Sequence, residues 1–90
     1  MIAVDTNILI YANRAELPLH AIARIRMTEL AEGALPWALP MVAAWGFVRI
    51  VTQSIFDPPT PITQAVEFID RLLASPTVCV PDPGPRHWEP

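Results

Sequence analysis

The first twelve residues constrain the fold more than any other part of the chain, because a short polar turn separates two apolar runs there. Ile2 to Val4 form the first run, Asp5-Thr6-Asn7 form the turn, and a second run begins at Ile8. A carboxylate at the carboxyl end of a buried parallel strand points into the crevice where α/β proteins bind ligands. The pattern therefore predicts a buried strand over residues 2–4, a helix that starts within residues 8–12, and a ligand site at Asp5.

Three further segments repeat apolar residues at helical spacing. They predict helices over residues 19–32, 41–52 and 62–74. The third of these helices is expected to take Thr60 as its N-cap and Pro61 as its first residue, because these residue types favour those positions. The side chains expected to face the core are, in chain order, Leu19, Ala23, Met27, Leu30, Ala31, Met41, Trp45, Val48, Val51, Ile62, Val66, Ile69 and Leu73.

Two short segments complete the predicted strands. Residues 35–40 are apolar and framed by prolines, and residues 77–80 are rich in β-branched side chains. Strands that alternate with helices indicate an α/β fold with a parallel sheet. Because such a sheet ordinarily has about five or six strands, the 90 residues are interpreted as a partial domain whose C-terminal third is missing.

Composition narrows the class of protein. No apolar run reaches the roughly 18–20 residues of a membrane span, so no membrane association is expected. Cys79 is the one cysteine, which excludes an internal disulfide framework and favours the cytoplasm; its thiol is expected to be buried. The net charge of −3 gives no overall attraction to nucleic acid. All six basic residues are arginine, and arginine suits contacts with phosphate. The general amino-acid usage of the source genome is an alternative explanation for the absence of lysine.

Asp5 has two interpretations from the residues alone. Carboxylate oxygens are the ligands that hard divalent cations such as Mg²⁺ or Mn²⁺ prefer. A carboxylate at this position also suits a helix N-cap, where it accepts hydrogen bonds from backbone N–H groups. Thr6 and Asn7 are placed to orient the carboxylate in either case, but they cannot neutralise its charge. At this level both interpretations stay open.

The order of motifs along the chain resembles that of the PIN-domain nucleases, and of the VapC-type toxin ribonucleases in particular. The pattern is colinear over nearly all of the 90 residues, which makes it more specific than the acidic turn alone. The motifs that carry the resemblance are Asp5-Thr6-Asn7, Tyr11-Ala12, His20 to Ala23, Trp45 to Thr52, Ile55 to Pro59, Ala65 to Leu73, the strand after Pro76, and Pro83 to His87.

The resemblance implies a PIN-like parallel sheet flanked by helices and a metal-dependent endoribonuclease that cuts RNA phosphodiesters. A cluster of carboxylates holds Mg²⁺ in such proteins, so the resemblance implies that Asp5 is the catalytic metal ligand and that Thr6 and Asn7 support it. It also implies an antitoxin protein that lies over the active site, and a homodimer. Arg49, one turn after Gly46 on a predicted helix, is a candidate phosphate contact, with a surface ion pair as the alternative.

Two departures from the family pattern leave other hypotheses open. Many members carry a glutamate where this chain has Gly46, and the family's remaining acidic residues would lie beyond residue 90. The alternative function is therefore a catalytically inactive, truncated fragment that retains only antitoxin or dimer contacts, and its open sheet edge would promote self-association. A third hypothesis is a small α/β domain in which Asp5 only caps a helix.

The other polar and aromatic residues are expected to serve structure. Glu67 and Asp70 fit a solvated helix face, and His20 fits the start of a helix. Trp37 and Trp45 are expected in the core rather than on a surface that stacks RNA bases. Near the C-terminus, Asp82 is expected in a turn, His87 in an exposed tail and Trp88 without a packing partner.

Overall fold

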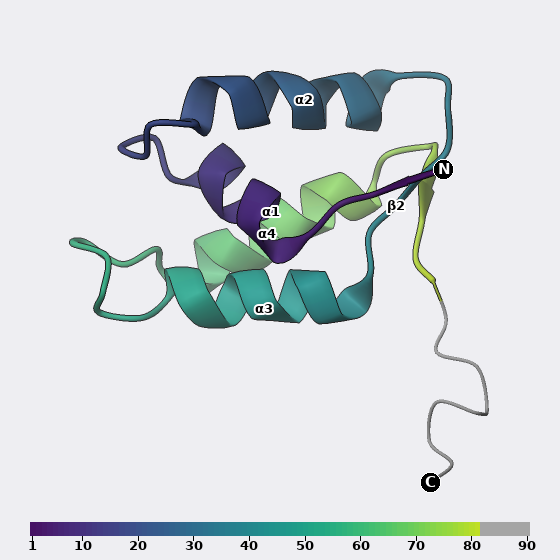
Figure 1. Ribbon diagram of the computed structural model, residues 1–90. Helices are drawn as coiled ribbons and strands as arrows, with labels where there is room; N and C mark the ends of the chain where they lie inside the picture. Colours follow the sequence, from purple (N-terminus) through teal and green to yellow (C-terminus); the bar gives the residue numbers. More distant parts are fainter. Residues whose placement is uncertain (82–90) are drawn as a thin grey trace, which may run out of the picture.

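Helices and short strands alternate along the chain in the computed structural model, which describes residues 1–81 (Figure 1). The expectations for Asp82, His87 and Trp88 lie outside the described residues. The elements are, in chain order, β1 (Ile2–Ala3), α1 (Thr6–Asn13), α2 (His20–Glu32), β2 (Trp37–Ala38), α3 (Met41–Val51), α4 (Ile62–Leu73) and β3 (Val78–Cys79). Each predicted helix and strand is confirmed, with bounds that shift by a few residues.

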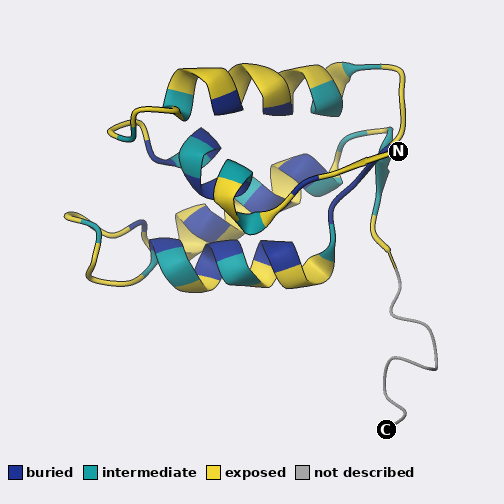
Figure 2. Ribbon diagram, in the orientation of Figure 1, coloured by how far each residue is buried: buried dark blue, intermediate teal, exposed yellow. Residues whose placement is uncertain are grey.

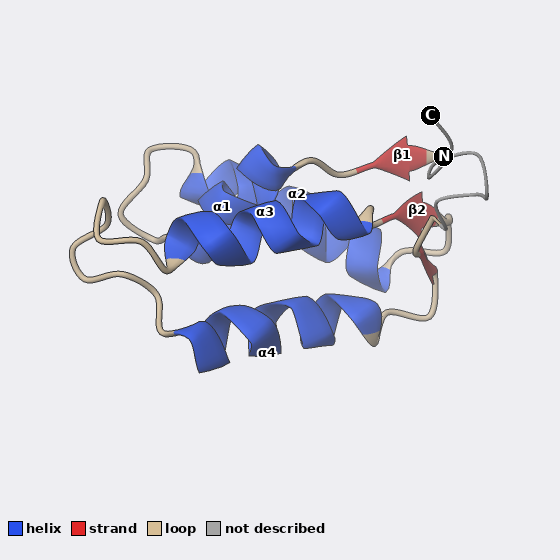
Figure 3. Cartoon of the chain, turned by 90° about the horizontal axis from the view of Figure 1, so that it is seen from below, coloured by secondary structure: helices blue, strands red, loops and turns tan. Residues whose placement is uncertain are grey.

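The three strands form one parallel sheet in the order β1-β2-β3. Ile2 pairs with Trp37, and Trp37 in turn pairs with Val78. Two views agree that the strands gather at one end of the helices, while the loops between α1 and α2 and between α3 and α4 lie at the other end (Figures 1 and 3). The predicted α/β architecture with a parallel sheet is therefore confirmed over residues 1–81.

α1 lies at the centre of the helical layer, packed against α2 on one side and α3 on the other, and α4 packs against α3. This position buries Leu9, Ile10 and Ala12 of α1 (Figure 2). The largest fully buried side chains are Trp37, Phe47, Leu9, Leu39 and Val51, so the core joins the middle strand to α1 and α3. Trp37 is thus a core residue, as predicted. None of the described helices is long and apolar enough to cross a membrane.

The loop end of the molecule is held by a buried arginine. Arg14, which follows α1, is 8% exposed, and its Nη1 donates to Thr60 Oγ1 at 2.9 Å. Thr60 Oγ1 donates in turn to Asn13 Oδ1 at 3.1 Å. The prediction that Thr60 caps α4 is therefore wrong, because its hydroxyl is committed to the end of α1. Pro61 takes the N-cap position instead, without a side-chain hydrogen bond.

The prediction of a buried first strand is also wrong. Ile2 is 47% exposed and Ala3 is exposed, whereas Val4, just after the strand, is buried. The physical reason is position: β1 is at an edge of the sheet and pairs only with β2 among the described strands. Cys79 in β3 is half-buried rather than fully buried, since β3 forms the other edge.

Several large side chains expected in the core lie on the surface instead. Trp45 is 65% exposed, while Phe47 on the same helix is fully buried. α3 is apolar nearly all round its circumference, so periodicity alone does not decide which face is inside. Small residues decide it, because Ala43 and Ala44 face the core and allow the helix to pack closely. The other exposed members of the predicted core set are Leu19, Met41, Ile62 and Val66.

Candidate functional site

Asp5 occupies the turn between β1 and α1 and caps the helix. Its Oδ1 accepts a hydrogen bond from the backbone N–H of Ile8 at 3.0 Å, and its backbone is extended, as an N-cap requires. The carboxylate is exposed, although the strand before it is predicted to be buried. Within residues 1–81 its second oxygen makes no hydrogen bond. The cap therefore holds one oxygen in place and leaves the other available to solvent or a ligand.

Thr6 and Asn7 point to different parts of the molecule. Thr6 is half-buried, and its Oγ1 donates to the backbone carbonyl of Ala43 at 3.2 Å, which ties the start of α1 to α3. Asn7 is exposed, and its side chain makes no hydrogen bond with any described residue. Neither side chain contacts the Asp5 carboxylate through a hydrogen bond in the described chain, and their supporting role stays a prediction.

Gly46 lies directly opposite Thr6 across the contact between α3 and α1. A Cβ atom at position 46 would lie 2.8 Å from Thr6 Oγ1 and 3.3 Å from Thr6 Cγ2. Even a methyl group is therefore too large here unless Thr6 moves, and a glutamate side chain would meet the same obstacle. A glycine inside a helical pattern is a sequence signal for close packing. Gly46 therefore has a packing role, which its interpretation as a missing acid does not predict.

The described chain assembles no cluster of potential metal ligands that includes Asp5. No three His, Cys, Asp or Glu side chains in residues 1–81 gather closely enough to hold a metal ion. Glu67 and Asp70 are exposed on α4, in agreement with the solvated face that their spacing predicts. One carboxylate can supply one Mg²⁺ ligand, with water or other groups needed for the remaining positions.

The structure also describes the contacts of Arg49 and His20, two other residues whose roles the sequence predicts. Arg49 is exposed in the last turn of α3 and forms no ion pair with residues 1–81, so its proposed phosphate contact stays a prediction. His20 begins α2, and its Nδ1 lies 2.9 Å from the Tyr11 carbonyl oxygen. His20 therefore joins α2 to α1, which fits the structural role that the sequence predicts.

Known proteins with similar sequences are ribonucleases. The chain is 42% identical over 89 residues to VapC ribonuclease Mb2897 from Mycobacterium bovis and to Ribonuclease VapC43 from Mycobacterium tuberculosis. It is 32% identical over 88 residues to Ribonuclease VapC31 from Mycobacterium tuberculosis. The first two matches cover 98% of this chain and 60% of the relative, and the third covers 97% and 62%.

The chain therefore spans about three-fifths of the length of the curated relatives that it matches. The sequence matches no protein-family model. The resemblance predicted from the order of motifs is confirmed by these relatives, because it extends over nearly the whole chain.

Proposed function

Because this chain is related to the VapC ribonucleases along nearly all of its length, we propose that it is part of a PIN-like, metal-dependent endoribonuclease of a toxin–antitoxin system. The proposed substrate is RNA, and the proposed domain comprises residues 1–90. The observation that carries the proposal is the Asp5 carboxylate, which α1 orients through one oxygen while the other stays free of hydrogen bonds within residues 1–81.

The residues present fit one part of a Mg²⁺ site. Asp5 would hold the ion through its second oxygen, which accepts no hydrogen bond within residues 1–81. A bound Mg²⁺ would supply Lewis acidity toward a phosphodiester and an activated water. The other ligands would come from water or from groups outside residues 1–81, because no three His, Cys, Asp or Glu side chains of the described chain gather into a metal site.

A second candidate function is binding of a protein partner without catalysis. The absence of any group of three His, Cys, Asp or Glu side chains that could hold a metal ion in residues 1–81 favours it. In that case the chain would retain contacts with an antitoxin protein or with a second copy of itself. Both partners also belong to the first proposal, as does a cytoplasmic location, for which the one free cysteine provides support.

The test is cleavage of a panel of single-stranded RNAs with and without Mg²⁺, by the parent chain and by Asp5→Asn. Asparagine caps helices about as well as aspartate, so Asp5→Asn removes the charge and keeps the cap. We expect Mg²⁺-dependent cleavage that falls at least about 100-fold in Asp5→Asn, because a metal ligand is lost. Asp70→Asn is the matched control, since Asp70 is exposed on α4 and makes no hydrogen bond through its side chain in residues 1–81.

Thermal melting must show that both variants fold like the parent chain. Cleavage that survives Asp5→Asn would contradict the role of Asp5. A folded parent chain that cuts no RNA at any Mg²⁺ concentration would favour the second candidate function.

A further inference from the structure

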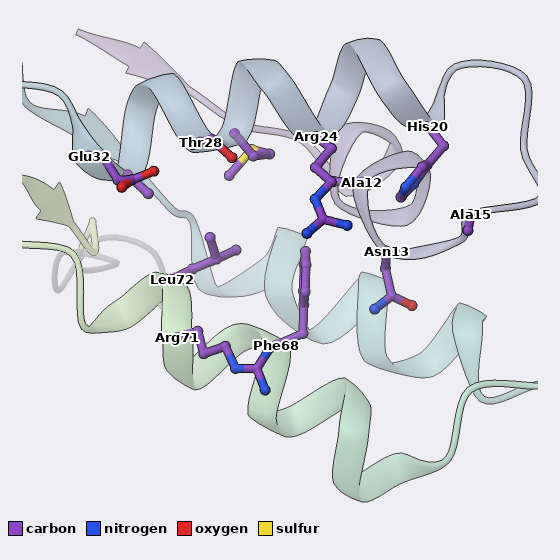
Figure 4. Close-up of a pocket in the computed structure, with 12 residues that line it drawn as sticks. Ala12, Asn13, Ala15, His20, Arg24, Thr28, Glu32, Phe68, Arg71 and Leu72 are labelled. Carbon is purple, nitrogen blue, oxygen red and sulfur yellow. The ribbon is translucent and has the colours of Figure 1, made fainter.

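A cavity of about 600 Å³ lies between α2 and α4, beside the end of α1 (Figure 4). Asp5 is not part of it, because Asp5 precedes the first residue of α1 whereas Asn13, the last residue, lines the cavity. Eight helical residues separate the two places by about 12 Å at 1.5 Å per residue. The cavity is therefore distinct from the site around Asp5, and its volume is in the range of sites for small molecules.

Two arginines from different helices line this cavity. Arg24 extends from α2 toward Phe68, and Arg71 lies near Phe68 on α4 (Figure 4). Both arginines are exposed, and neither forms an ion pair with a residue in the described part of the chain. Glu32 lines the cavity too, at the end away from His20. Two guanidinium groups without carboxylate partners in residues 1–81 make the cavity wall around Phe68 attractive to anions.

The ring of Phe68 gives the cavity a flat apolar surface beside these charges. Phe68 is half-buried, and its ring packs against the fully buried Phe47 with centroids 5.0 Å apart and planes at 34°. The core therefore holds the ring in place from one side. A fixed aromatic ring next to cationic groups is the combination on which single-stranded nucleic acids stack their bases while arginines contact the phosphates.

Polar groups on the wall of the cavity have unused hydrogen-bonding capacity. Asn13 Oδ1 already accepts from Thr60, so within residues 1–81 the Asn13 amide N–H groups have no hydrogen-bond partner. His20 Nδ1 is occupied by the Tyr11 carbonyl, and Nε2 makes no hydrogen bond in the described chain. The Asn13 N–H donors suit phosphate oxygens and the acceptor atoms of bases.

We propose that this cavity binds one nucleotide of a single-stranded RNA, with its base on Phe68 and with Arg24 and Arg71 as contacts of the phosphates on either side of that base. The proposal deepens the proposed function by adding a strand-binding subsite, and it rests on that function for the choice of RNA. An acidic protein segment would use the two arginines, but its carboxylates would leave the flat ring without a matching group. The ring therefore favours the nucleotide.

Binding can be measured apart from cleavage. Fluorescence anisotropy of a 5′-labelled octauridylate, in EDTA and at low salt, reports affinity when no metal is present. We expect Arg24→Gln and Arg71→Gln each to weaken binding about fivefold, and each to reduce the slope of log K against log salt by about 0.7. Arg26→Gln is the matched control, because Arg26 is exposed on the same helix as Arg24 and lies outside the cavity. All three variants lose one positive charge, so the RNA affinity of Arg26→Gln should stay within about twofold of that of the parent chain.

The ring is tested with two substitutions. Phe68→Leu removes the stacking surface and should weaken binding about tenfold. Phe68→Tyr keeps a flat ring and should bind like the parent, which separates stacking from any loss of packing against Phe47. Thermal melting of both variants shows whether the fold is intact.

Equal affinities of the Arg24, Arg71 and Arg26 variants would overturn the proposal. So would binding of a labelled oligoglutamate peptide, in place of the RNA, that depends on Arg24 and Arg71, because it would assign the cavity to an acidic protein partner. Arginine-dependent RNA binding by a chain that cuts no RNA would leave the cavity site intact and count only against the ribonuclease. Cleavage that depends on Asp5, without binding at the cavity, would support the ribonuclease and overturn the cavity site.

Discussion

At the scale of single residues, Asp5 shows that capping a helix and binding a ligand are compatible roles. One carboxylate oxygen accepts from Ile8 N–H, and this bond fixes the direction of the group. The second oxygen remains exposed, so a metal ion could use it without loss of the cap. The N-cap interpretation of Asp5 is confirmed, and the metal-ligand interpretation, which stays a prediction, would use the other oxygen.

Arg14 is the one charged residue that is buried in the described part of the chain. Its buried guanidinium donates to Thr60 and to Glu16 Oε2, the latter at 2.8 Å from Nε, and lies 4.6 Å from the centre of the Phe56 ring. We expect Arg14→Met to lower the free energy of unfolding by about 2 kcal/mol, a typical value for hydrogen bonds to a charged group. Arg14→Lys should also destabilise, because a compact ammonium cannot reproduce the guanidinium fork.

Urea unfolding at pH 7 measures these losses, and Arg26→Met serves as the control, expected within about 0.5 kcal/mol of the parent. Part of the loss should depend on pH. A hydrogen bond from its own backbone amide, followed by the hydrogen bond from Arg14, lowers the pKa of Glu16. A lowered pKa stabilises the fold above the unfolded value of about 4.3 and ceases to do so as pH falls through the folded value. The effect of Arg14→Met should therefore shrink in acid, and a loss that grows there would contradict this account.

At the scale of elements, the contact between α1 and α3 depends on the absence of a side chain. Gly46 allows α3 to approach Thr6, whose hydroxyl then reaches the Ala43 carbonyl. Glycine inside a helix ordinarily costs up to about 1 kcal/mol relative to alanine. Here that cost is offset by close packing beside the turn that carries Asp5.

We expect Gly46→Ala to destabilise the chain by about 1–2 kcal/mol, because overpacking at Thr6 outweighs the gain in helix propensity. In a Thr6→Ala background the same change should be neutral or stabilising, since the obstructing Oγ1 and Cγ2 atoms are gone. The difference between the two backgrounds, measured by urea unfolding of all four chains, isolates this contact. Equal effects of Gly46→Ala in both backgrounds would show that Thr6 is not the obstacle.

At the scale of the whole molecule, two of the apolar surfaces that are open in the described chain are suited to association with other chains. One is the outer edge of β1, where Met1 and Ile2 are exposed. The other is a groove of about 160 Å³ between α3 and α4, lined mainly by apolar side chains that include Trp45 and Val66. Unpaired strand edges and large apolar patches both promote association of chains.

We expect the 90-residue chain to self-associate at micromolar concentrations, as seen by light scattering coupled to size-exclusion chromatography. Ile2→Lys tests the strand edge and Trp45→Gln tests the groove, and each side chain is exposed enough for the substitution to leave the core intact. Val42→Gln is a further variant with an exposed apolar side chain on α3 outside the groove. A monodisperse monomer that melts cooperatively at high concentration would contradict the expectation for both surfaces.

The elements and the position of Asp5 were predictable from the sequence, because they depend on neighbours in the chain. An N-cap bond joins residues three apart, and a helix is specified by spacing within about a dozen residues. The parallel order of the strands follows from the helices that separate them. The helices and the N-cap are decided by contacts between residues close in sequence, and the parallel direction of the strands follows from the length of the connections between them.

Only the tertiary structure decided which faces are inside and which distant residues meet. α3 is apolar nearly all round, so the choice of Phe47 over Trp45 for the core required the packing of α1 and α4 against it. The Thr60 hydroxyl serves Arg14, 46 residues earlier, rather than its own helix. Arg24 and Phe68 reach one cavity from helices far apart in the chain. Side-chain periodicity specifies the faces of an element, whereas burial depends on which partner covers each face, and that partner is set by the whole fold.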